Sequence, residues 1–179
     1  MKSEIYSPIP ERTWRWLGVN AARYSEPVTG ITSYALSPLA AENTYVKPIE
    51  ALTAEAAALL EKAENAAAAP AADYVTKNRN SGSFVEVPAH AQADAPIHLD
   101  YVLDAENPVL IDEQAIIARA GSRATVVLAY RGEGAFHRGL TRIYIEPGAE
   151  LHLVKVQLLS TQTNHADSVG VYAAGDAHF

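Results

Sequence analysis

Short runs of alternating apolar and polar residues dominate the sequence after residue 81. The clearest are Phe84–Val87, Ala124–Tyr130 and Leu151–Val156, and they are rich in β-branched side chains. Such alternation is typical of strands with one buried face. Gly, Pro, Asn and Asp residues separate the runs. Residues 82–179 are therefore predicted to form short strands joined by turns.

These strands recur with a fixed period of 27 residues. Three similar phrases place Gly121, Gly148 and Gly175 just before a strand segment. A period of roughly 20 to 30 residues made of strands and turns is typical of a solenoid in which each coil pairs with the next. We therefore predict a right-handed parallel β-helix, with a glycine at the corner before each strand.

The period also predicts which residues stack inside the β-helix. One period before Gly121 lies Asp94, so that four coils are expected. This register aligns Ile97 with Ala124 and Leu151, and all three should point inward. His98 and His152 would then be two coils apart, nearly 10 Å at the usual strand spacing, which is too far to share one metal ion.

The sequence before residue 82 divides into two further parts. Residues 1–47 form an N-terminal region with extended segments and one short helix, which Thr13 would cap and Gly18 would end. Residues 48–81 form an alanine-rich helix and a linker. The helix is predicted from Pro48 to Ala69, because Pro48 suits a first turn and Pro70 would stop it.

Composition excludes several classes of function. The 179 residues carry a formal net charge of −7 and show no cluster of Lys and Arg, so a nucleic-acid partner is not expected. The chain has no cysteine, which excludes disulfides, a thiolate nucleophile and a cysteine-ligated cluster within it. Neither a signal peptide nor an apolar run long enough for a membrane span is evident, and we expect a cytoplasmic protein.

Two histidines are the candidates for a weak metal site. His137 and His165 are one coil plus one residue apart, and Asp167 is close by. Because no tight ligand spacing supports a metal, we expect solvated loop histidines instead. Several acids resemble the paired carboxylates of polysaccharide-cleaving β-helices, but they are interpreted as solvated turn residues. They are Asp100, Asp104, Glu106, Asp112 and Glu113.

Three segments resemble those of the SufB/SufD family of the SUF system. They are Pro10–Asn20 with its Trp-Arg-Trp triplet, Gly82–Pro88, and Pro147–Gln157. The resemblance implies a non-enzymatic scaffold subunit for iron–sulfur cluster assembly, working with a SufC-type ATPase and a SufB/SufD-type partner. It implies no cofactor in this chain, with the cluster expected only in the full complex. The absence of cysteine favours the SufD-like side of the family.

The end of the sequence suggests an N-terminal fragment, because the last coil stops at Phe179 within its own strand. We expect the region that contacts the ATPase to be absent, and the open end of the β-helix is a candidate homodimer contact. The alternative function is a carbohydrate-active or adhesive parallel β-helix, which would normally be exported. A left-handed acyltransferase helix requires a six-residue period, which the sequence does not show.

Overall fold

The computed structural model describes residues 3–6, 22–25, 31–34, 45–63 and 69–179, and its architecture is mainly β. The elements, in which η denotes a 3-10 helix, are β1 (Ser3–Tyr6), β2 (Ala22–Ser25), β3 (Val46–Pro48), η2 (Ile49–Ala51), α1 (Ala54–Leu60), η3 (Glu61–Ala63), α2 (Ala69–Asn78), β4 (Ser81–Val87), β5 (Ile97–Leu103), β6 (Val109–Ala118), β7 (Arg123–Gly132), β8 (Phe136–Ile145), β9 (Glu150–Leu159) and β10 (Asn164–Ala173). The expected short helix at Thr13 to Gly18 lies outside the described residues.

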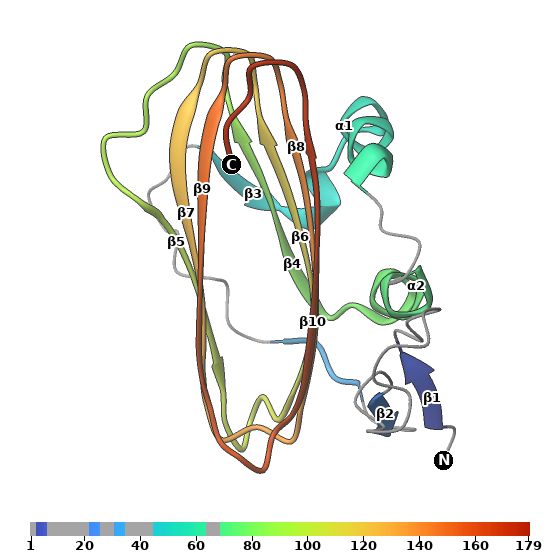
Figure 1. The fold of residues 1–179 in the computed structure, drawn as a ribbon. Helices are drawn as coiled ribbons and strands as arrows, with labels where there is room; N and C mark the ends of the chain where they lie inside the picture. The colour runs from blue at the N-terminus through green and yellow to red at the C-terminus, as the bar shows by residue number, and fades with distance from the viewer. Residues whose placement is uncertain (1–2, 7–21, 26–30, 35–44, 64–68) are drawn as a thin grey trace, which may run out of the picture.

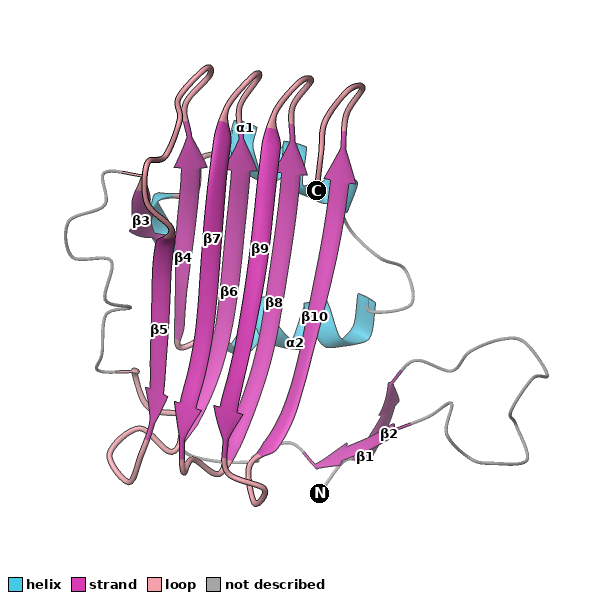
Figure 2. Cartoon of the chain, turned by 60° about the vertical axis from the view of Figure 1, so that its left-hand side comes forward, coloured by secondary structure: helices cyan, strands magenta, loops and turns pink. Residues whose placement is uncertain are grey.

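The strands from β4 to β10 wind into a parallel β-solenoid of about three turns, with about 28 residues per turn. Each full coil contributes one strand to each of two sheets, ordered β10-β8-β6-β4-β3 and β5-β7-β9. Strands of successive coils pair in parallel, and in these two sheets only β3 pairs antiparallel, with β4. The two sheets face each other as a flattened tube (Figures 1 and 2). The predicted parallel β-helix is confirmed.

A stack of four tight turns forms one corner of the solenoid. Their third residues are His90, Gly121, Gly148 and Asp176, each with a positive φ between 57° and 68°. Gly121 and Gly148 therefore lie where predicted, because glycine adopts this conformation without steric cost. In the last turn Asp176, not Gly175, takes this position, since one extra residue precedes it. The period is thus close to 27 but not constant.

The first coil is where the predicted register is wrong. Ile97 pairs with Val126, two residues beyond Ala124. The turn residue of this coil is His90 and not Asp94, because the step from β4 to β6 is longer than the later steps. Ile97, Ala124 and Leu151 nevertheless all point into the apolar core of the solenoid, as expected.

Helices cover the outer face of the sheet that contains β4, β6 and β8 (Figure 1). The single helix predicted from Pro48 to Ala69 is wrong: α1 begins after Thr53, whose hydroxyl accepts a hydrogen bond from the Ala56 N–H at 3.1 Å. Pro70 lies in the first turn of a second helix, α2, where proline is tolerated. None of the helices in the described ranges is long and apolar enough to cross a membrane.

Candidate functional site: a polar row inside the solenoid

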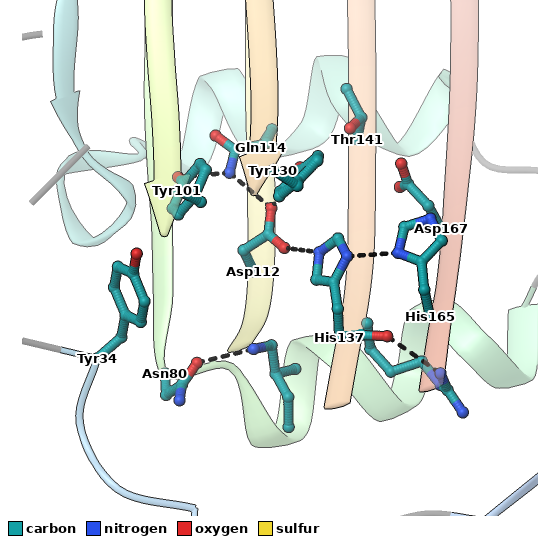
Figure 3. Close-up of polar contacts among 12 residues, drawn as sticks. Tyr34, Asn80, Tyr101, Asp112, Gln114, Tyr130, His137, Thr141, His165 and Asp167 are labelled. Atoms are coloured by element: carbon teal, nitrogen blue, oxygen red, sulfur yellow. Dashed lines mark hydrogen bonds and ion pairs between the residues drawn. The ribbon is translucent and has the colours of Figure 1, made fainter. Parts of the chain in front are cut away.

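The interior of the solenoid has an apolar part and a polar part. Near the stacked turns, inward side chains such as Ile116, Leu151 and Ile145 form the main apolar core. Toward the opposite end, six hydrogen-bonding side chains replace them on β5, β6, β7, β8 and β10. We call these six residues the polar row: Tyr101, Asp112, Gln114, Tyr130, His137 and His165 (Figure 3).

Asp112 lies at the centre of the polar row and is fully buried. Its Oδ2 accepts hydrogen bonds from the Tyr130 hydroxyl at 2.9 Å and from Gln114 Nε2 at 2.8 Å. Its Oδ1 lies 2.7 Å from Nε2 of His137. Three donors thus surround one carboxylate, which is what a buried anion requires. Gln114 also donates to the Tyr101 hydroxyl at 2.6 Å and so extends the row toward β5.

His137 and His165 occupy directly paired positions on β8 and β10. Their Nδ1 atoms are 2.6 Å apart, and the two rings stack with centroids 4.7 Å apart. His137 is fully buried between Tyr130 and His165, whereas His165 is partly exposed. The expectation that these are solvated loop histidines is therefore wrong. The repeat correctly predicted that the two histidines are neighbours on successive coils, but they lie in strands and not in a loop.

A second set of charged groups lies next to the polar row. Asp167 points inward from β10, forms an ion pair with Lys155 of β9, and is partly buried. Lys155 also donates a hydrogen bond to the Thr141 hydroxyl at 3.1 Å. These contacts keep a carboxylate and an ammonium group inside the solenoid without leaving either charge isolated.

Burial and hydrogen bonding shift the pKa values of the polar row in opposite directions. Burial opposes ionisation of Asp112, but the hydrogen bond and charge of His137, with Gln114, more than offset it and hold its pKa below the usual range. Burial, followed by the charge of Asp112, raises the pKa values of Tyr101 and Tyr130. Burial, followed by the charge of His137, lowers the pKa of His165 to about 4. The row thus holds the Asp112 carboxylate as an anion, next to the charge of His137 and to two neutral tyrosines.

Of the acids interpreted as solvated turn residues, the structure separates two kinds. Asp104 caps a turn, and its Oδ1 accepts a hydrogen bond from the Asn107 N–H at 2.7 Å, as expected for a turn residue. Asp112 and Glu113 instead lie within β6 and are fully buried, so the interpretation is wrong for them. Glu113 points outward under the helices, where it forms ion pairs with Arg79 and Arg142. The apolar residues on both sides of these acids were the signal of a buried strand.

The side chains of the polar row do not suit a metal ion or a cluster. Within the described ranges, no group of three or more His, Asp or Glu side chains is placed to hold a metal ion. Both ring nitrogens of His137 are engaged, one with Asp112 and one with His165. The chain has no cysteine to supply thiolate ligands. The polar row is therefore described by hydrogen bonding and proton exchange, not by coordination chemistry.

Comparison with protein families identifies the domain to which the polar row belongs. Residues 101–179 match the family described as SUF system FeS cluster assembly, SufBD core domain. The match begins at Tyr101 and includes every residue of the polar row. Residues 101–179 therefore form a SufBD core domain, which links the chain to the SUF system of iron–sulfur cluster assembly. No curated protein and no solved structure matches the chain.

Proposed function

We propose that this protein is a scaffold subunit for iron–sulfur cluster assembly that acts in a complex with a SufC-type ATPase and a second SufB/SufD-type subunit. One observation carries the proposal: the SufBD core match covers all strands from β6 to β10 and the end of β5 from Tyr101, which form most of the solenoid. A rigid solenoid presents extended sheet faces and strand edges, which suit the binding of other subunits. We place this complex in the cytoplasm.

The polar row supports a structural rather than an enzymatic role. Its central groups, Asp112 and His137, are fully buried and already hydrogen-bonded to each other. A general base must reach the proton that it removes from a substrate, and the side chains of Asp112 and His137 contact only other protein groups. We therefore propose that the subunit has no hydrolase or lyase activity of its own.

The cluster itself is cargo of the complex in this proposal. Because the chain lacks cysteine, thiolate ligands would come from the partner subunit, and this chain would take the SufD-like place. Iron and sulfide added to this chain alone would then leave no bound cluster. The same additions to the assembled complex would leave one.

Co-expression tests the proposal directly. The tagged chain is produced with the SufC-type ATPase and the SufB/SufD-type subunit from the same source, purified under anaerobic conditions, and incubated with ferrous iron and sulfide. We expect the SufB/SufD-type subunit to co-purify with the chain and to bring the ATPase with it, and the visible absorption of an iron–sulfur cluster to appear only in the complex. The partner subunit alone and the chain alone are the matched controls.

Three results would contradict different parts of the proposal. Recovery of the chain free of both proteins, at matched expression, would exclude the complex. A cluster retained by the chain alone would exclude the partner as the source of ligands. Turnover of a polysaccharide by the purified chain would exclude the non-enzymatic role. Light scattering of the chain alone would show whether it forms a homodimer in the absence of its partners.

A further inference from the structure

The contact between His137 and His165 has room for one hydrogen. His137 Nε2 lies 2.7 Å from a carboxylate oxygen of Asp112, so this nitrogen carries a hydrogen and donates it. The charge of His137 lowers the pKa values of both Asp112 and His165, and a charged imidazole carries a hydrogen on its other nitrogen, Nδ1, as well. This Nδ1 lies 2.6 Å from Nδ1 of His165, which must be the acceptor. Asp112 thus favours the charged His137 ring, and the neutral His165 ring accepts the one hydrogen between the two Nδ1 atoms.

This hydrogen bond joins two coils of the solenoid. His137 belongs to β8 and His165 to β10, and the rest of the β8–β10 pairing is a regular parallel ladder. Inside the tube, β10 otherwise holds its place near the polar row through the ion pair of Asp167 with Lys155. The histidine contact is therefore a main polar link between these coils in the interior.

We propose that the His137–His165 pair is a pH-sensitive clasp, which holds β10 against β8 while one hydrogen lies between the two Nδ1 atoms and releases it when both atoms carry one. Two hydrogens cannot fit between nitrogens 2.6 Å apart, so the fully protonated pair must separate. This proposal does not depend on the proposed function.

The surrounding groups act in both directions on this protonation. Asp112 on β6 and Asp167 on β10 favour a positive charge on the pair, whereas Lys155 on β9 disfavours it. The Tyr130 ring on β7 packs at a tilt against the His137 ring, with centroids 4.3 Å apart, and stays neutral because its pKa is raised. Burial and the charge of His137 outweigh the two carboxylates, and the pKa of His165 falls to about 4.

The sign of the pH effect follows from this shift. An opened β10 exposes His165 to water, where its pKa returns to about 6.5. Between these two values the opened form binds more protons than the closed form, so acid favours opening. The closed form is fully stable above about pH 6.5 and loses stability as the pH falls toward 4.

Hydrogen exchange of the backbone amides tests the clasp. We expect β10 to lose protection about tenfold between pH values of about 7.5 and 5, after correction for intrinsic exchange rates, while β6 keeps its protection. His165→Gln should abolish this loss, because the side-chain oxygen of glutamine can accept the hydrogen of His137 Nδ1 and does not titrate. His152→Gln, on the exposed face of the neighbouring strand β9, is the matched control, and β10 should lose protection in this variant as it does in the wild-type protein.

Two outcomes would overturn the proposal. One is unchanged protection of β10 in the wild-type protein at the lower pH. The other is an equal loss in His165→Gln, which would assign the effect to another group; Asp167→Asn then shows whether the Lys155 ion pair is responsible. If His165→Gln does not fold, NMR titration of the wild-type imidazoles decides, since a midpoint for His165 near the ordinary value of about 6.5 contradicts the clasp.

Discussion

Gly139 and Asp167 occupy paired positions on β8 and β10, and the carboxylate of Asp167 fills the space where residue 139 would otherwise carry a Cβ. A Cβ built at Gly139 would lie 2.7 Å from Asp167 Oδ1 and 3.3 Å from His137 Nε2. Asp112 precedes Gly139 in the same inward column. The glycine therefore makes room for an acid on the coil beyond it.

Gly139→Ala should destabilise the protein by about 1–3 kcal/mol, because the added methyl group must displace the Asp167 carboxylate and its ion pair with Lys155. Urea unfolding followed by circular dichroism measures the change. Gly175→Ala is the matched control, since no atom lies within 4 Å of a Cβ built there. Equal effects of the two substitutions would contradict the close approach of Asp167.

The parallel solenoid could be predicted from the sequence because its cause is repetitive. Inward apolar residues and turn glycines recur at nearly the same interval, and Gly121 and Gly148 mark two corners. The register of the first coil could not be predicted, because more residues separate the paired positions of β4 and β6 than those of later strands. In addition, His90 stands where later turns have glycine. The prediction of one helix from Pro48 to Ala69 was wrong because alanine favours helix at every position and does not indicate where a helix begins. Thr53 sets that point as the N-cap of α1.

The polar row could be predicted only in part from the sequence. The pairing of His137 with His165 followed from the period, but their burial did not, because glycines and charges surround His137 in the chain. Asp112 was missed for the opposite reason: acids are rarely buried, so an acid within an apolar strand was interpreted as a turn. Three donors from three other inward positions make its burial tolerable, and only the folded coils bring them together.

Asp112→Ala should destabilise the protein by about 3–5 kcal/mol, since it leaves the donors of Gln114, Tyr130 and His137 without their shared acceptor. Denaturant unfolding provides the measurement. Asp94→Ala, at an exposed position before β5, is the control and should change stability by less than about 0.5 kcal/mol. A loss at Asp112 no larger than at Asp94 would show that the carboxylate does not organise the polar row.

The stacked turns allow a prediction with opposite signs at equivalent positions. Gly148→Ala should cost about 1 kcal/mol, because its φ of 68° strains a residue with a Cβ although nothing lies within 4 Å. Asp176→Gly should be neutral or stabilise by up to about 0.5 kcal/mol, since it relieves the same strain at a φ of 57°. Thermal unfolding of both variants distinguishes them. A loss of stability in Asp176→Gly would mean that its side chain contributes more than the strain costs.

The pH dependence of global stability should show two separate windows. His165, whose pKa falls to about 4 on folding, makes the folded state lose stability as the pH drops from about 6.5 toward 4. Because this side chain is partly exposed, we expect a loss of about 1–2 kcal/mol. Asp112, whose pKa is lowered, contributes stability that is present above its unfolded value of about 3.9 and is lost as the pH falls below it.

Urea unfolding at a series of pH values separates these two windows. His165→Gln should flatten the stability profile between about pH 6.5 and 4 and leave the lower window intact, because glutamine does not titrate. Asp112→Asn should flatten the lower window and leave the upper window intact, since the amide carries no charge to lose. A profile that keeps its upper slope in His165→Gln would assign that slope to other groups and would remove the thermodynamic basis of the clasp.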